Sequence, residues 1–337
     1  MKRLLILATA FMLALPLCAY AEDKKGAWLP YWNTALALNE ARQLADGLDR
    51  VIVFAAVFDA QGRPMLPEAA EELLLDAQVA FAGSDATVFL SVVNDWHRGK
   101  PEGKSAALLR KLLKDDASID AHIDDLLDLL DSTEADGLEL DYEGFGADRA
   151  LYGQYMTLIA RLQEILERDG IPLRVVLEWD AAEYAQLPAG PEYSIMCYNL
   201  YGTHSGPGPK AEAAFIDRVA ALYRETEATV RMALAAGGFI WQNGRNAAAV
   251  TQLEAEAILR EKGITPSRDE ASGALTAQYT DNRNTFTLWY ADGETLRRWQ
   301  ARLAGFDGID LFSLGGVSTG DWMLSVMKEQ EIMEADK

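Results

Sequence analysis

Residues 136–143 read Asp136-Gly137-Leu138-Glu139-Leu140-Asp141-Tyr142-Glu143, an apolar strand pattern with an acid at every second position from 139. Side chains alternate along a strand, so Glu139, Asp141 and Glu143 share one face. In a parallel barrel the apolar face packs on helices and these acids point inward. Closely spaced inward carboxylates are costly, so at least one pKa should rise, as a general acid requires. The alternative is a solvated edge strand with an acidic outer face.

Apolar runs alternate with amphipathic segments along the whole chain. The eight expected strands are residues 26–32, 50–58, 87–93, 137–142, 173–179, 193–198, 230–236 and 308–313. The expected helices are 39–48, 67–82, 104–132 as one or two helices, 147–169, 210–226, 246–263, 293–304 and 320–333, with only a short turn at 181–187. Most strands lack in/out alternation, which is typical of strands buried on both faces. This pattern predicts an α/β fold with right-handed crossovers. Eight units favour a closed (β/α)8 TIM barrel over an open doubly wound sheet.

The chain between the seventh and eighth strands is too long for one helix. Residues 277–289 read as a hairpin around the polar turn 281–284. We therefore expect a single barrel domain over 22–337 with a small α+β insertion at about 242–290. The insertion should wall one side of a cleft at the carboxyl ends of the strands, where such barrels carry their chemistry.

The first residues have the layout of an export signal. A basic start at 1–3 precedes an apolar run at 4–17 and the small-x-small site Ala19-Tyr20-Ala21. The run is too short for a membrane span of about 20 residues. Leu17 before Cys18 argues against lipid attachment. We expect a signal peptide over 1–21, export to the periplasm or the exterior, and no membrane insertion after cleavage.

Composition excludes several function classes. The chain has a formal charge of −21, and removing Lys2 and Arg3 with the signal changes it to −23. Such a protein repels nucleic acid. Cys197 is then the remaining cysteine, so no internal disulfide is possible, and its apolar surroundings indicate a buried position. The three histidines lack metal-ligand spacing and no phosphate loop or dinucleotide motif is present. We expect no cofactor, no metal and a monomer.

Residues 136–143 resemble the D-G-x-D-x-D-x-E signature of glycoside hydrolase family 18, the chitinase-like family. Asp136, Gly137, Asp141 and Glu143 match it, and Glu139 stands where the signature has Asp. The resemblance implies that Glu143 is the catalytic acid/base and that Asp141 orients the acetamido group of the substrate. It makes Glu139 a supporting carboxylate whose extra methylene changes the local geometry.

Other segments agree with this resemblance. Residues 196–199, Met196-Cys197-Tyr198-Asn199, are similar to the family's M-x-Y-D, which implies that Tyr198 bonds the acetamido carbonyl oxygen. Asn199 keeps hydrogen bonding but removes a charge. Residues 205–211, Trp289-Tyr290-Ala291-Asp292 and the third-strand run ending at Asn94 resemble the spore-cortex-lytic branch of the family. Phe312 stands where the family commonly has a Trp that floors a sugar subsite.

Aromatic residues near strand ends are candidate sugar contacts, because sugar rings pack on aromatic faces. For each of them, plain core packing is the alternative. His204, in the loop after the sixth strand, is a further candidate contact. The expected substrate-binding residues are Glu139, Asn199, Met196, Trp28, Tyr31, Trp32, Asn94, Trp179, Trp289 and Phe312.

The resemblance implies an exported hydrolase of β-linked, N-acetylglucosamine-containing glycans. Its mechanism would be retaining, with attack by the substrate's own acetamido oxygen, an exception to the scheme with two carboxylates. Peptidoglycan is the first expected substrate, followed by chitin oligomers and the chitobiose core of N-glycans. One rival is an inactive chitinase-like protein that only binds glycans, although such relatives usually lack the terminal Glu. The other is a two-carboxylate glycosidase acting on sugars without an acetamido group.

Overall fold

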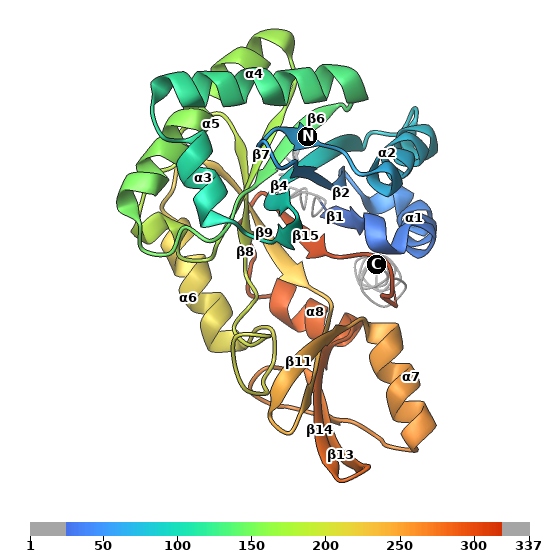
Figure 1. Ribbon diagram of the computed structural model, residues 1–337. Helices are drawn as coiled ribbons and strands as arrows, with labels where there is room; N and C mark the ends of the chain where they lie inside the picture. Colours follow the sequence, from blue (N-terminus) through green and yellow to red (C-terminus); the bar gives the residue numbers. More distant parts are fainter. Residues whose placement is uncertain (1–24, 319–337) are drawn as a thin grey trace, which may run out of the picture.

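The computed structural model describes residues 25–318. Eight parallel strands form a ring in the order β2-β1-β15-β9-β8-β7-β6-β4, and β4 pairs back with β2 to close it (Figure 1). The strands are β1 Lys25–Pro30, β2 Arg50–Phe58, β4 Thr87–Arg98, β6 Gly137–Asp141, β7 Leu173–Leu177, β8 Glu192–Met196, β9 Thr229–Ala235 and β15 Gly308–Phe312. All eight expected strands are present, which confirms the (β/α)8 barrel. The expected signal segment, with Cys18, and the expected helix 320–333 lie outside the described residues.

The helices of the described residues surround this barrel, except α7, which packs on an inserted lobe (Figure 1). They are α1 Thr34–Gln43, α2 Glu68–Phe81, α3 Ala106–Leu112, α4 Asp116–Thr133, α5 Arg149–Asp169, α6 Ala213–Tyr223, α7 Gln252–Lys262 and α8 Gly293–Gln300. The short elements are β3 Pro64–Met65, β5 Lys100–Glu102 and 3-10 turns at Tyr31–Asn33, Ala45–Gly47 and Ala181–Glu183. The expected segment 104–132 is two helices, because Asp115 caps the second one by accepting a hydrogen bond from the Ser118 backbone N–H at 3.0 Å.

Burial along β6 shows which face of the decisive strand points inward. Leu138, Leu140 and Tyr142 are buried beneath the surrounding helices. The Tyr142 ring stacks on Tyr155 of α5 at 5.5 Å, and its hydroxyl shares a hydrogen bond of 2.9 Å with His122 of α4. Burial lowers the pKa of His122 to about 3, so this pair is neutral. The apolar face of the strand therefore faces the helices, and the alternating acids face the barrel interior.

An inserted lobe follows the seventh barrel strand. Its antiparallel sheet has the order β11-β10-β14-β13-β12, and α7 packs on it (Figure 1). The strands are β10 Gly237–Gln242, β11 Arg245–Val250, β12 Ser267–Arg268, β13 Leu275–Asp281 and β14 Asn284–Ala291. The expected hairpin is β13–β14, and the lobe starts at 237, ahead of the expected 242.

The helix expected from 246 starts later. Residues 245–250 pair with β10 as β11, so the predicted helical start was wrong. The physical reason is a capping box: Thr251 accepts from the Glu254 N–H, and the Glu254 carboxylate accepts from the Thr251 N–H. This arrangement begins the helix at Gln252 and excludes the alanine-rich run before it.

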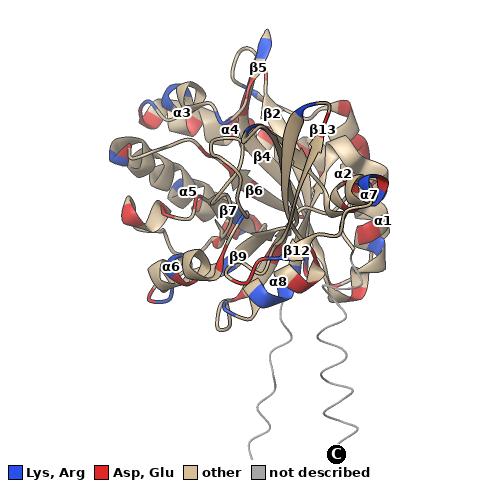
Figure 2. Ribbon diagram, turned by 90° about the horizontal axis from the view of Figure 1, so that it is seen from below, with Lys and Arg blue, Asp and Glu red and all other residues tan. Residues whose placement is uncertain are grey.

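Charged groups lie mainly on the outer helices and loops, while most of the strand ribbon carries none (Figure 2). Cys197 is buried, as expected, and burial raises the pKa of its thiol to about 12. Among residues 25–318, no helix is long and apolar enough to cross a membrane.

Candidate active site

Glu143 lies in the loop directly after β6, at the carboxyl end of the barrel. Its backbone is clamped by Asn94 of the neighbouring strand β4. The Glu143 N–H donates to Asn94 Oδ1, and Asn94 Nδ2 donates to the Glu143 carbonyl, both at 2.9 Å. Asn94 is 1% exposed, so it fixes the position of Glu143 and offers no surface to a substrate. The Glu143 side chain keeps 12% of its surface accessible.

Asp141 is two residues earlier on the same face of β6. Among residues 25–318, its buried Oδ1 has no hydrogen-bond partner. Burial raises the pKa of Asp141 well above its usual range, and the nearby Glu143 and Glu139 carboxylates raise it further, against a smaller opposing effect from Lys104. Within the described part of the chain, Asp141 Oδ1 is therefore an unpaired acceptor, at the residue that the family resemblance expects to contact the substrate acetamido group.

A cavity of about 390 Å³ opens beside Glu143. Its lining residues come from the carboxyl ends of the strands and from the lobe: Lys104, Glu143, Gly144, Glu178, Trp179, Met196, Tyr198, Asn199, Gly202, Thr203, His204 and Phe239. Five residues expected at the site, Glu143, Trp179, Met196, Tyr198 and Asn199, thus line one space. Asn199 has φ of 69°, a left-handed conformation that Asn tolerates better than most residues, which gives a backbone reason for Asn after Tyr198.

A second cavity of about 500 Å³ lies between the ends of β1 and β15 and the lobe. Trp32 and Phe312 line it, together with Gly237, Gly238 and residues 249–252 from the lobe and its link to α7. The Phe312 ring stacks on Tyr198 with centroids 6.0 Å apart, so this aromatic pair connects the two cavities. Residues from the lobe thus wall both cavities.

Some expected sugar contacts lie elsewhere. Trp28 is 1% exposed and donates its indole N–H to Glu139 Oε1 at 2.7 Å, so the expectation that it binds substrate is wrong. Tyr31 and Trp289 line neither cavity: Tyr31 packs edge-on against Trp32, and Trp289 pairs with Phe239 across the lobe sheet. The sequence pattern identified aromatic residues near strand ends but not which way their rings face.

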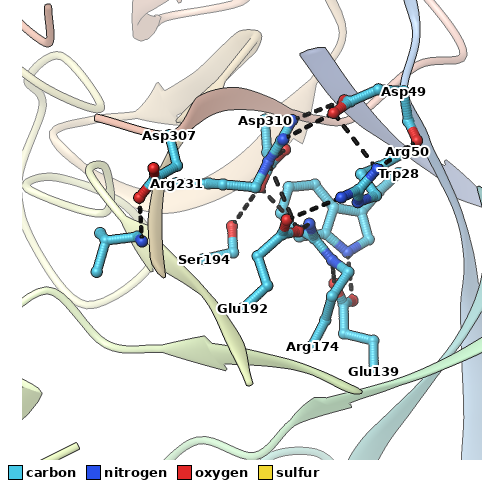
Figure 3. Close-up of polar contacts among 11 residues, drawn as sticks. Trp28, Asp49, Arg50, Glu139, Arg174, Glu192, Ser194, Arg231, Asp307 and Asp310 are labelled. Carbon is cyan, nitrogen blue, oxygen red and sulfur yellow. Dashed lines mark hydrogen bonds and ion pairs between the residues drawn. The ribbon is translucent and has the colours of Figure 1, made fainter. Parts of the chain in front are cut away.

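Glu139 belongs to an ionic network in the barrel interior (Figure 3). Arg174 Nε donates to Glu139 Oε2 at 2.9 Å, and Arg174 Nη2 donates to Asp310 Oδ2 at 2.8 Å. Arg231 Nε donates to Asp310 Oδ1 at 2.8 Å, and Glu192 also pairs with Arg174. Glu139 is fully buried in this network and lines neither cavity, so it is not placed to contact a substrate as expected.

The pKa values in this network follow its geometry. Burial alone would raise the pKa of Asp310, but Arg174 and Arg231 outweigh it and hold that pKa below its usual range. For Glu139, burial exceeds the opposing effects of Arg174 and Trp28, and its pKa is raised. The interior network therefore contains at least one carboxylate that is strongly held in its charged form.

Two charged residues that line the Glu143 cavity were not predicted from the sequence. Glu178 directly follows β7, and burial together with the Glu143 and Asp180 charges raises its pKa. Its place at a strand end was a signal that could have identified it. Lys104, between β5 and α3, donates from Nζ to Glu143 Oε2 at 2.5 Å, and no motif marks it. His204, a candidate in the sequence, lines the cavity.

No protein-family model matches the chain, and no curated protein matches it. Solved structures do. The Bacillus cereus spore cortex-lytic enzyme SleL superposes with a TM-score of 0.73 at 18% identity, over 90% of this chain and 74% of that one. A chitinase from Chromobacterium violaceum gives 0.75 at 17% identity, over 91% and 99%. A class V chitinase from Nicotiana tobaccum gives 0.68 at 16% identity, over 90% and 98%. These likenesses show the fold, and they agree with the resemblance carried by residues 136–143.

Proposed function

We propose that this chain is a glycoside hydrolase that cleaves β-linked glycans containing N-acetylglucosamine. One observation carries the proposal: the Glu143 side chain lines a cavity together with Tyr198, while the buried Asp141 Oδ1 beside it lacks a partner among the described residues. A substrate acetamido group would satisfy that atom through its N–H. The fold shared with chitinases and with a cortex-lytic enzyme supports the same assignment.

The arrangement supports substrate-assisted hydrolysis. Glu143 gives its proton to the glycosidic oxygen, and the bond from that oxygen to the anomeric carbon breaks. The acetamido oxygen attacks the anomeric carbon and forms a cyclic intermediate, with Asp141 on the acetamido N–H and the Tyr198 hydroxyl on its oxygen. Glu143, now a carboxylate, takes a proton from water. The water oxygen attacks the anomeric carbon from the face that the leaving sugar occupied, and this opens the cyclic intermediate. The anomeric configuration is retained, and no enzyme nucleophile is needed.

Peptidoglycan is the proposed first substrate and chitin oligomers the second. Trp32 is 60% exposed and Phe312 lines the same cavity, so both offer aromatic faces to further sugars of a chain. The signal-like start supports export to the periplasm or the exterior, and we propose that the mature protein acts there as a monomer.

One observation favours the rival, a protein that only binds glycans. Lys104 Nζ donates to Glu143 Oε2, one of the two carboxyl oxygens that could carry the catalytic proton. In a binding-only protein this contact would persist with glycan bound. In the proposed enzyme the glycan displaces it.

Turnover separates these functions. The wild type and Glu143→Gln are compared on N-acetylglucosamine oligomers and on peptidoglycan, with products identified by mass spectrometry. We expect Glu143→Gln to lose about 10³-fold in rate, the size typical of a lost general acid. Equal rates for the two proteins would contradict the proposal. A thiazoline mimic of the cyclic intermediate should inhibit the wild type, and lack of inhibition would favour a two-carboxylate glycosidase.

A further inference from the structure

Lys104 is a cation in an acidic cleft. Of the described residues that line the Glu143 cavity, Lys104 is the one Lys or Arg, whereas Glu143 and Glu178 are both acidic. Its side chain is 55% exposed, so it reaches solvent as well as Glu143. Lys104 is the exposed partner of this ion pair, and ion pairs of exposed lysines add little to folding stability. The position of Lys104 therefore calls for a reason other than stability.

The backbone holds Lys104 in place beside the acid. Its N–H donates to Asp95 Oδ1 at 2.9 Å, and the next N–H, of Ser105, donates to the Asn94 carbonyl at 2.9 Å. A Cβ on Gly144 would lie 2.7 Å from the Lys104 carbonyl oxygen, so the two loops touch. Lys104 has φ of 53°, a left-handed conformation that disfavours a residue with a Cβ. Such strain persists where the surroundings impose it, and it is frequent at functional sites.

The charged groups facing Lys104 keep it cationic. Desolvation lowers the pKa of Lys104, but the carboxylates of Glu143, Asp141 and Glu178 outweigh that effect and raise it. The side chain of Asp95 lies at the base of the same loop, where it accepts the Lys104 N–H. An anionic ligand would compete best for this ammonium group, because its charge-assisted hydrogen bond is stronger than one from a neutral sugar hydroxyl.

The proposed function places that anion on the substrate. Glu143 protonates the glycosidic oxygen, so a group in contact with Glu143 lies beside the bond that joins the two sugars. In a β-1,4 link that oxygen is O4 of the leaving sugar, and O3 is on the adjacent carbon. We propose that Lys104 selects glycans whose leaving sugar carries a free carboxylate on an ether at O3, as N-acetylmuramic acid does without its peptide. This inference rests on the proposed role of Glu143.

The same contact would free the acid. When Lys104 moves to the substrate carboxylate, Glu143 Oε2 becomes available to the glycosidic oxygen. The preferred substrate thus draws Lys104 away from the Glu143 carboxyl group. A neutral glycan must displace Lys104 without offering it a new partner, and it is hydrolysed less efficiently.

The inference also gives the reaction a place in a sequence. In intact peptidoglycan this carboxyl group is bound to the peptide as an amide, which carries no charge. An amide hydrolase must act first. Water adds across the amide bond, the carbonyl carbon keeps the oxygen as a carboxylate, and the peptide leaves with its free amine. The glycan strand left by that class of reaction is the substrate that Lys104 recognises.

The test uses glycans that differ in one group. Peptide-free strands of N-acetylglucosamine and N-acetylmuramic acid are compared with the same strands after conversion of their carboxylates to methylamides. The full-length protein is assayed as wild type, Lys104→Met and Lys104→Arg. Lys100→Met serves as the control, since Lys100 is exposed and does not line the cavity. For wild type and the control, kcat/KM should be about tenfold higher on the carboxylate strands, the value of one charge-assisted hydrogen bond.

Lys104→Met should bring this ratio close to one, and Lys104→Arg should keep most of it. A wild-type ratio of one, or an unchanged ratio in Lys104→Met, overturns the role of Lys104 and leaves the proposed hydrolase intact. If the wild type cleaves none of the glycans, the proposed function fails instead. Affinities for the same strands are then measured by calorimetry. A tenfold preference for the carboxylate strands that is lost in Lys104→Met supports the role of Lys104. Equal affinities for the two kinds of strand, or no binding, overturn it.

Discussion

The barrel interior holds one set of carboxylates that arginines neutralise, while its carboxyl end holds another that they do not. In the lower set, Arg174 and Arg231 bond Glu139, Asp310 and Glu192 (Figure 3). In the upper set, Asp141, Glu143 and Glu178 face Lys104 alone among the described cations of the cavity. The same residue types therefore stand in opposite electrostatic surroundings a short distance apart along the strands.

The two sets therefore contribute to stability with opposite dependence on pH. The arginines lower the pKa of Asp310, so its contribution to stability is present above the ordinary pKa of an Asp and is lost as the pH falls. Burial and like charges raise the pKa of Asp141, so its contribution is present in acid and is lost as the pH rises through the raised pKa. Asp310 and Glu192, whose pKa values the arginines lower, therefore stabilise the barrel at neutral pH. Asp141 and Glu139, whose pKa values burial raises, reduce its stability there.

The largest effect should come from breaking the lower set. Arg174→Met leaves Glu139 and Asp310 buried without their main partner, which we expect to reduce the free energy of unfolding by about 3–5 kcal/mol. Denaturant titration at neutral pH measures it. Arg161→Met, which breaks the two surface ion pairs with Asp116 and Asp120, should cost less than about 1 kcal/mol. Similar losses for both variants would show that the interior network is not what stabilises the barrel.

Asp141→Asn should lower the activity but raise the stability of the protein. Activity should fall about 10²-fold, because the substrate acetamido group loses its carboxylate partner. The free energy of unfolding at neutral pH should rise, because the cost of burying an ionisable carboxyl group is removed. That gain should shrink as the pH falls through the raised pKa of Asp141 and be absent well below the ordinary pKa of an Asp. Unfolding curves at several pH values check the sign, and a variant destabilised at neutral pH would contradict the account.

Asn94→Ala should have a smaller effect on activity. Asn94 acts on the upper set through its hydrogen bonds to the Glu143 backbone. The variant removes both hydrogen bonds that clamp Glu143, and we expect kcat to fall about tenfold with KM little changed. Steady-state kinetics on one oligosaccharide measures the split. A change confined to KM would instead indicate that Asn94 contacts the substrate.

Trp32→Ala should have the smallest effect, since Trp32 lies away from both sets of charges. Loss of its exposed aromatic face should raise KM about fivefold for long oligosaccharides and leave kcat unchanged. Short substrates that do not reach the second cavity provide the comparison. An equal change for short and long substrates would place Trp32 outside the path of the glycan.

The sequence was sufficient for the barrel and for the direction of its acids, for physical reasons. Strands buried on both faces are apolar runs, and alternation along residues 136–143 settles which side chains point inward. It was insufficient for the lower network. Trp28 and Glu139 are 111 residues apart and Arg174 and Asp310 are 136 apart, and no local pattern pairs groups at such separations.

Two further features could not be predicted from the sequence pattern, because they depend on contacts between distant residues. Trp28 and Trp32 look alike in the sequence, yet one is buried on Glu139 and the other is 60% exposed. The alanine-rich run at 245–250 has the composition of a helix, but its pairing with β10 makes it a strand. In both cases tertiary contacts decide what local preference leaves open.

The central claim is that Glu143 donates a proton to the leaving group. It is tested most directly by comparing kcat/KM of the wild type and Glu143→Gln on an unactivated N-acetylglucosamine oligomer and on an aryl glycoside of the same sugar. Because a good leaving group departs without a proton, the account predicts a loss of about 10³-fold on the oligomer and a much smaller loss on the aryl glycoside. Equal losses on the two substrates, or no loss on either, would contradict it.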